Sequence, residues 1–279
     1  MKLKILVPTD FSDCAHNALD YALGLSADLN AEIVLMHSII YNDSSFIDQD
    51  SIENENSMRY NEAKTNIDKV RDYCKNKNQG IVVKSILDSG PAELSVSSAI
   101  DKEKIDYVVM GTEGSSGLKA SIFGSFTSNV LVISPCPVFT IPVTGKYKGI
   151  KTIVCATEMD GSENRALKHT IELARKFNAH ITFYNVNSSE EEQRVRFYKF
   201  ERVIPQLADY NSIDYVTVES DDILESIESY VFDKQPDLIV TLGKGRTFFD
   251  QLFGKHVTKK LCLHTTIPLL SFPTYKKDS

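Results

Sequence analysis

The sequence predicts an α/β protein made of two tandem, doubly wound domains with mostly parallel sheets. Three observations lead to this prediction. Short apolar runs alternate with helical patterns, as in parallel strands joined by helical crossovers. The opening of the chain recurs in its second half at an offset of 148 residues. Each half closes with an apolar run bracketed by prolines, which is typical of an edge strand because proline cannot donate to a ladder.

The composition agrees with two soluble domains. The chain has 279 residues, of which 42% are apolar and 25% charged, enough for two hydrophobic cores. No apolar run approaches the roughly 18–20 residues of a membrane span, so we expect no membrane association. The five cysteines are scattered without a C-x-x-C pair, which favours a reducing cytoplasm over a disulfide framework or a zinc site.

The charge balance argues against nucleic-acid binding. Residues 1–146 carry 13 Lys or Arg against 19 Asp or Glu, and residues 147–279 carry 18 against 19. A nucleic-acid-binding domain normally presents a basic surface, and neither half is basic. We therefore expect no nucleic-acid partner.

The duplication fixes the predicted domain boundary. Three pairs of segments align: Ile5–Ser12 with Ile153–Asp160, Asp106–Val109 with Asp237–Val240, and Pro137–Pro142 with Pro268–Pro273. Between the halves lies a short polar stretch with glycines at 145 and 149, as in a linker. The predicted domains are therefore residues 1–145 and 146–279.

Within the first half, the elements follow in order. Apolar runs predict five strands, over residues 4–8, 32–37, 81–86, 106–111 and 137–141. A helix is expected after the first strand because its apolar residues share one face: Ala15, Ala18, Leu19, Ala22 and Leu23. Ser12 is a good N-cap for it, and Asp160 has the same place in the second half. Further helices are expected over 51–78 and about 92–103, where Pro91 suits the first turn.

The most informative stretch runs from Gly111 to Ser125 and reads GTEGSSGLKASIFGS. It follows the apolar run 107–110 and leads into a helical pattern. Glycines at such a turn let the backbone approach a bound group closely and turn its N–H groups towards an anion. This loop is no P-loop, because no Gly-Lys-Ser/Thr follows. The alternative is a flexible turn before a helix.

Four features together resemble the universal stress protein family in its tandem form. They are the opening Ile5–Ser12, the strand ending Leu35-Met36-His37, the glycine motif through Gly124-Ser125, and the closing Pro137-Val138. The resemblance implies a five-stranded, adenine nucleotide α-hydrolase-like domain with strands 1 and 4 adjacent, and a ligand outside their carboxyl ends. Many members bind ATP there and others do not. It also implies an internal pseudo-dimer, with strands 138–141 and 269–272 pairing antiparallel.

By this resemblance the nucleotide site of the first domain contains Pro8, Thr9, Asp10, Ser38, Met110, Gly111, Gly114, Gly124, Ser125, Phe126 and Thr127. Loop amides and the Ser125 hydroxyl would hold a triphosphate. Asp10 would lie near the ribose or the phosphates, with Mg²⁺ or Mn²⁺ between the negative charges. Two alternatives stay open: Asp10 braces the turn, and Met110 is a core residue.

The second half departs from this pattern. The substitutions are Ala156 for Pro8, Glu158 for Asp10, Leu242 for Gly111 and Lys255 for Ser125, and only eight residues separate Gly245 from Gly254. A side chain at 242 would crowd a phosphate, and the shifted loop would present different amides. We therefore predict that residues 146–279 carry a degenerate motif that does not bind ATP in the family manner.

The functional expectation is a cytoplasmic, ATP-binding stress-response or regulatory protein. No side chain is an obvious general base, so we expect no catalytic residue and at most slow ATP hydrolysis. One alternative is a nucleotide-free scaffold that acts through protein contacts. Another is an adenine-nucleotide enzyme, which would need a second substrate pocket. The sequence leaves open the protein partners and whether the pseudo-dimer pairs again into a homodimer.

Overall fold

The computed structural model describes residues 2–42, 49–112, 125–157, 163–187, 209–242 and 267–273. Its contacts divide the chain into two compact units, one reaching Lys146 and the other beginning at Tyr147. We call them the first and the second unit.

The first unit is a parallel α/β sheet, as the sequence predicts. Its strands are β1 (Lys4–Pro8), β2 (Glu32–Ile39), β3 (Val83–Ser89), β4 (Tyr107–Gly111) and β5 (Val138–Ile141). They lie in the order β3-β2-β1-β4-β5, and the pairs β1–β2, β2–β3, β1–β4 and β4–β5 are parallel. The chain leaves β1 towards β2 and returns to β4 on its other side. The switch point therefore lies between β1 and β4, where a ligand crevice is expected.

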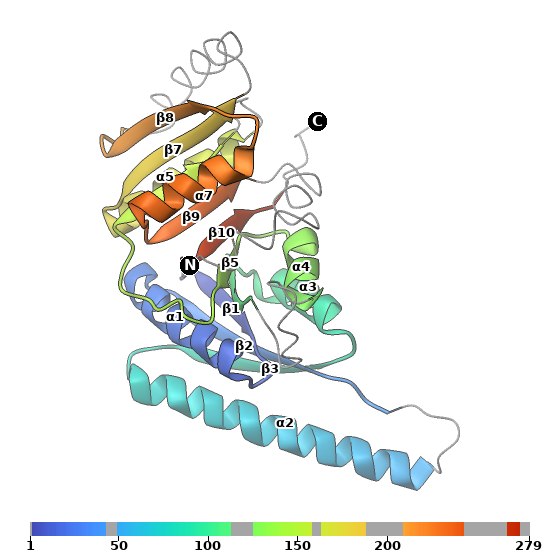
Figure 1. Ribbon diagram of the computed structural model, residues 1–279. Coiled ribbons are helices and arrows are strands. Elements are labelled where there is room, and N and C mark those ends of the chain that lie inside the picture. The colour runs from blue at the N-terminus through green and yellow to red at the C-terminus, as the bar shows by residue number, and fades with distance from the viewer. Residues whose placement is uncertain are drawn as a thin grey trace. The chain divides into compact units, whose positions relative to one another are not determined.

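Four helices cover this sheet: α1 (Asp13–Leu29), α2 (Gln49–Lys77), α3 (Ala92–Glu103) and α4 (Ser125–Ile133). Right-handed crossovers place α1 and α2 on one face and α3 and α4 on the other (Figure 1). All four helices therefore start at the edge of the sheet where the strands end. Among the described residues, no helix combines the length and the apolar character that crossing a membrane requires.

Helix α1 forms as its sequence indicates. The Ser12 Oγ accepts a hydrogen bond from the Ala15 amide at 3.3 Å, which confirms the predicted N-cap. The helix ends at Asn30, whose φ of 50° is left-handed. The predicted apolar face is buried against the sheet, with Ala18 and Ala22 fully covered.

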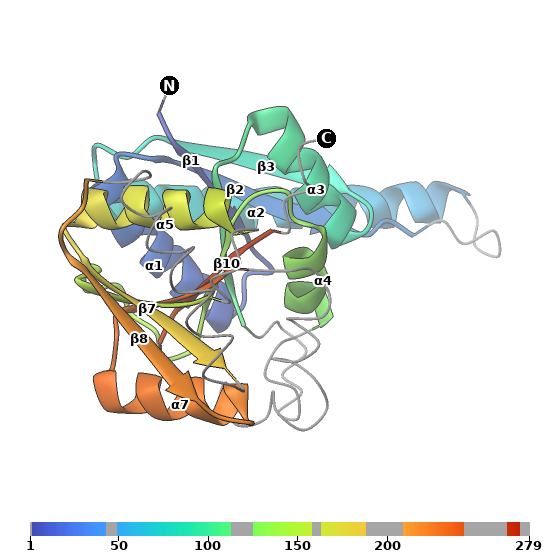
Figure 2. The same ribbon diagram turned by 90° about the horizontal axis from the view of Figure 1, so that it is seen from above.

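The second unit repeats the arrangement. Its elements are β6 (Thr152–Ala156), α5 (Asn164–Phe177), β7 (His180–Asn187), β8 (Ile213–Glu219), α7 (Ile223–Lys234), β9 (Leu238–Leu242) and β10 (Leu269–Phe272). Its strand order is β10-β9-β6-β7-β8, and all its strand pairs are parallel. Figure 2 shows α5 and α7 on opposite sides of β7 and β8.

One predicted cap in this unit is wrong. Helix α5 begins at Asn164 with Glu163 in the N-cap position, so Asp160, which lies outside the described residues, is not its cap. The buried carboxylate of Glu163 accepts a hydrogen bond from the Thr157 hydroxyl at 2.6 Å. This contact ties the residue before α5 to the residue after β6.

Equivalent hydrogen bonds show that the duplication is structural. The Asp106 carboxylate accepts from the Lys4 amide at 2.8 Å, and Asp237 accepts in the same way from the amides of Lys151 and Thr152. Each of these aspartates precedes the strand that pairs with the first strand of its unit. The same side-chain contact therefore joins the starts of two paired strands in both units.

Candidate functional site

A cavity of about 760 Å³ lies at the carboxyl edge of the first unit's sheet. Its wall contains nine of the eleven residues predicted from the sequence: Pro8, Thr9, Asp10, Ser38, Met110, Gly111, Ser125, Phe126 and Thr127. The other two, Gly114 and Gly124, lie outside the described residues. The fold thus gathers at one place residues that are more than 100 positions apart in the chain.

The turn after β1 presents Asp10 to the cavity. The Thr9 amide donates to the Met36 carbonyl oxygen at 2.8 Å and so extends the β1–β2 pairing by one residue. The Asp10 Oδ1 accepts hydrogen bonds from the Ser12 amide at 3.0 Å and from the Ser12 hydroxyl at 2.6 Å. Phe11 between them has a left-handed φ of 63°. Asp10 therefore braces this turn and lines the cavity at the same time.

Gly111 ends β4 directly beneath the start of α1. A Cβ at this position would lie 2.4 Å from the Cys14 Sγ and 3.1 Å from the Cys14 carbonyl oxygen. Real Cβ atoms essentially never come within 3.0 Å of another atom, so the packing of α1 on β4 favours glycine here. The sequence points to close ligand approach at this position, whereas the steric demand that the structure shows comes from α1.

Helix α4 is tied to the end of β4. The buried Thr127 hydroxyl donates to the Gly111 carbonyl oxygen at 3.0 Å. This bond fixes the first turn of α4, whose first residue, Ser125, is exposed and lines the cavity. The first amides of a helix have no partner within the helix, so this turn offers hydrogen-bond donors at the cavity wall.

Ser38 joins β2 to the turn between β3 and α3. Its hydroxyl donates to the Gly90 carbonyl oxygen at 2.5 Å, and Gly90 has a φ of +119°, which favours glycine. The neighbouring His37 Nδ1 lies 2.8 Å from the Thr9 carbonyl oxygen, and its ring packs 4.4 Å from that of Phe11. Ser38 therefore faces the cavity while His37 supports the turn after β1.

The segment after β2 forms the outer wall, and α2 holds it in place. Ile40 and Tyr41 line the cavity. The Asn42 amide donates to the Asn56 Oδ1 at 2.9 Å, and the Asn56 Nδ2 returns a bond to the Asn42 carbonyl oxygen at 3.0 Å. Arg59 donates to the Ile40 carbonyl oxygen at 3.1 Å. These hydrogen bonds, which we call the clamp, hold the backbone of this wall to side chains of α2.

Sequence reasoning missed ten residues of the wall. They are Ala15, Met36, His37, Ile40, Tyr41, Ser89, Gly90, Pro91, Ala92 and Glu93. One usable signal was alternation along a strand, because Met36 lies two residues before Ser38 and shares its face. Another was Pro91, which marks the start of α3 at the same sheet edge.

The wall divides into an apolar and a polar part. Ile40 and Pro91 provide exposed apolar surface, whereas Pro8, Met36 and Met110 border the cavity as buried residues, so Met110 is also the core residue of the alternative reading. Helices α1, α3 and α4 all begin at the cavity, and their N-terminal ends carry partial positive charge. None of the described lining residues is Lys or Arg, so an anion here would depend on amides and hydroxyls.

The oxygen donors on the wall suit a hard divalent ion. Asp10, Thr9 and Ser125 offer carboxylate and hydroxyl oxygens, which Mg²⁺ accepts together with phosphate oxygens. Within the described ranges no group of three or more His, Cys, Asp or Glu side chains could hold a metal by itself. A metal ion would therefore bind here together with a phosphorylated ligand.

The second unit differs at the equivalent positions that the structure describes. Ala156 ends β6 where Pro8 ends β1, and Leu242 ends β9 where Gly111 ends β4. Leu242 is only 2% exposed. Glu158, Gly245, Gly254 and Lys255 lie outside the described residues.

Comparison with known proteins gives consistent matches. The chain is 28% identical over 153 residues to the universal stress protein YxiE of Bacillus subtilis (strain 168), covering 50% of this chain and 97% of that protein. It is also 28% identical over 156 residues to the universal stress protein MJ0577 of Methanocaldococcus jannaschii, covering 50% and 95%. Each relative therefore corresponds to one half of the chain.

A solved structure matches the whole chain. It is a universal stress protein from Archaeoglobus fulgidus DSM 4304, with a TM-score of 0.73 and 18% identity, covering 98% of both chains. At this identity the likeness concerns the fold. The model of the Universal stress protein family matches residues 1–142 and again residues 149–273. With a match to each half, the chain belongs to the universal stress protein family in a tandem arrangement.

Proposed function

We propose that the first unit binds ATP together with Mg²⁺ or Mn²⁺ and that the chain acts as a cytoplasmic stress-response or regulatory protein through this site. The observation that carries the proposal is that one cavity collects nine of the predicted nucleotide-binding residues. Its volume of about 760 Å³ lies within the usual range of ligand sites, about 300–1,000 Å³.

The apolar part of the wall suits the base. Pro8, Met36 and Met110 offer flat or polarisable surface to an aromatic ring. The Ser38 hydroxyl donates its only proton to the Gly90 carbonyl oxygen. The Ser38 oxygen can therefore only accept a hydrogen bond from a ligand. An acceptor at this place favours the amino group of adenine over the carbonyl group of guanine or hypoxanthine.

The polar part of the wall suits the phosphates. The converging N-terminal ends of α1, α3 and α4 stabilise negative charge, and the Ser125 hydroxyl adds a donor. Asp10 repels phosphate unless a cation lies between them. When bound, Mg²⁺ or Mn²⁺ supplies that positive charge, and Asp10, held by Ser12, orients the ion and the phosphates.

The remaining residues, 146–279, are proposed to serve pairing or interaction, with residues 1–145 as the nucleotide-binding domain. In this proposal β5 and β10 form the seam of an internal pseudo-dimer. The bracketing prolines at 137, 142, 268 and 273 support this role, because they suit strands at a sheet edge.

Titration calorimetry with Mg-ATP tests the proposal. We expect saturable binding of about one ATP per chain, and weaker binding when EDTA removes the metal, because Asp10 then faces uncompensated phosphates. No heat at millimolar ATP would refute the nucleotide role and favour a scaffold acting through protein contacts. Two equivalent ATP molecules per chain would contradict the assignment of the site to the first unit alone. Rapid turnover of ATP with a second substrate would favour an enzyme.

Ser38→Ala should weaken discrimination between bases. We expect wild-type protein to prefer ATP over inosine triphosphate about tenfold, which corresponds to one hydrogen bond of about 1.4 kcal/mol. The variant should bind both with similar affinity, because it has lost the acceptor. Ser38→Thr keeps the hydroxyl and should keep the preference. Competition binding with the two nucleotides measures the ratio, and an unchanged ratio in Ser38→Ala would exclude this role.

A further inference from the structure

The second unit places Tyr184 where the first unit places Met36. The Thr157 amide donates to the Tyr184 carbonyl oxygen at 3.0 Å, as the Thr9 amide donates to that of Met36 at 2.8 Å. Helices α3 and α7 also correspond. Each has 12 residues, and α3 lies between β3 and β4 as α7 lies between β8 and β9. Ser95 of α3 and Ser226 of α7 each donate an amide bond to the residue four positions earlier.

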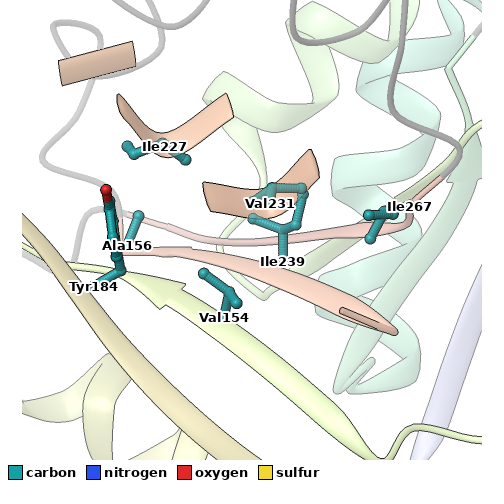
Figure 3. Packing of buried hydrophobic residues seen from close by; sticks show 7 residues of the cluster. All are labelled: Val154, Ala156, Tyr184, Ile227, Val231, Ile239 and Ile267. Atoms are coloured by element: carbon teal, nitrogen blue, oxygen red, sulfur yellow. The ribbon is translucent and has the colours of Figure 1, made fainter. Parts of the chain in front are cut away.

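The Tyr184 side chain extends from β7 to the first turns of α7. Its side chain is 3% exposed, and its hydroxyl donates to the Ser226 carbonyl oxygen at 3.1 Å and lies 2.8 Å from the Ser226 Oγ. Its ring stacks on that of Tyr230 with a centroid distance of 4.4 Å. Figure 3 shows the side chain rising beside Ala156 with its oxygen directed towards the segment that carries Ile227.

The positions of Pro8 and Met36 are buried in both units, with Met36 1% and Tyr184 3% exposed, but the residue on the second strand is larger in the second unit. Ala156 and Tyr184, which correspond to Pro8 and Met36, form a buried cluster with Ile227 and other apolar side chains of this unit. Val186, at the position of Ser38, packs against the same cluster. Ala156 is smaller than proline and leaves room beside the ring of Tyr184.

We propose that Tyr184, anchored on α7, fills in the second unit the space that forms the inner end of the ligand cavity in the first. The aromatic side chain is then a specificity-determining residue that confines ligand binding to the first unit. That Tyr184 fills this space is a statement about the second unit alone. That the filling prevents nucleotide binding there rests on the proposed function.

Thermal unfolding of Tyr184→Ala tests the filling without any nucleotide. We expect the Tm of the variant to fall by roughly 5–10 °C, because a buried aromatic side chain leaves a cavity. Added p-cresol, which has the shape of the missing side chain, should recover part of that loss. Tyr184→Phe leaves no cavity and should show a smaller loss that p-cresol does not reverse. A Tm of Tyr184→Ala within about 1 °C of wild type would overturn the proposal.

The reciprocal change tests the consequence in the first unit. Met36→Tyr should place a tyrosine opposite Ser95, fill the inner end of the cavity, and weaken ATP binding at least tenfold. Met58→Tyr is the matched control, because Met58 lies on α2 and is 72% exposed. Wild-type affinity in Met36→Tyr would show that a tyrosine at this strand position does not close the space.

The two experiments separate the two proposals. If wild-type protein binds no ATP, the nucleotide role fails, but the Tm of Tyr184→Ala and its response to p-cresol still decide whether the second unit is filled. If ATP binds and Tyr184→Ala behaves as wild type, the nucleotide role stands and the filling by Tyr184 is refuted.

Discussion

Gly111→Ala should destabilise the protein by about 2 kcal/mol, within the range known for overpacked cores. The added methyl group would lie 2.4 Å from the Cys14 Sγ and 3.1 Å from the Cys14 carbonyl oxygen, so both the thiol and the backbone of α1 must shift to admit it. Urea denaturation measures the loss. Because α1 and β4 both border the cavity, we also expect ATP binding to weaken.

The chain offers a matched control at Gly80. A Cβ there would meet only the Asn78 Oδ1, at 3.6 Å, so Gly80→Ala should change the stability by less than about 0.5 kcal/mol. Combining Gly111→Ala with Cys14→Ala removes the closest atom and should recover part of the loss. If Gly111→Ala proves as stable as Gly80→Ala, α1 does not impose glycine on this position.

Thr127→Val should cost about 1–3 kcal/mol, because it leaves a buried carbonyl oxygen without its donor. Valine matches the shape of threonine, so the change isolates the bond from the Thr127 hydroxyl to the Gly111 carbonyl oxygen. Without this bond the first turn of α4 is no longer fixed at the cavity. We expect the ATP affinity to fall together with the stability, and urea denaturation and calorimetry measure the two effects.

Thr127→Ser keeps the hydroxyl and serves as the control for this site. It should retain most of the ATP affinity and lose only the packing of one methyl group. Equal losses in the valine and serine variants would mean that packing, and not the hydrogen bond to Gly111, positions α4.

Much of the fold could be predicted because its signals are local. Strand β1 and helix α3 have the predicted bounds, since apolar periodicity and Pro91 mark them. Strand β2 extends beyond its apolar run, because Ser38 and Ile39 still pair with Asp88 and Ser89 of β3. That pairing depends on a partner strand some 50 residues away, which no local pattern reveals.

The site was predictable where a motif marks it and not where packing builds it. The turn after β1 and the end of β4 carry recognisable residues. Met36 and Glu93 resemble ordinary core and surface residues, and only the strand order and the start of α3 bring them to the cavity. Glu93 also accepts a hydrogen bond from the Asn129 Nδ2 of α4 at 3.1 Å, a contact between segments far apart in the sequence.

The clamp between α2 and the outer wall has a thermodynamic consequence. Asn56 and Arg59 hold the backbone at Asn42 and Ile40, so the conformation of the wall and the order of this part of α2 are linked equilibria. By reciprocity, whatever stabilises one also stabilises the other. Figure 1 shows α2 extending beyond the strands that it covers. An event that orders this polar helix on the outside of the unit would therefore stabilise the wall of the cavity without contact with the cavity itself.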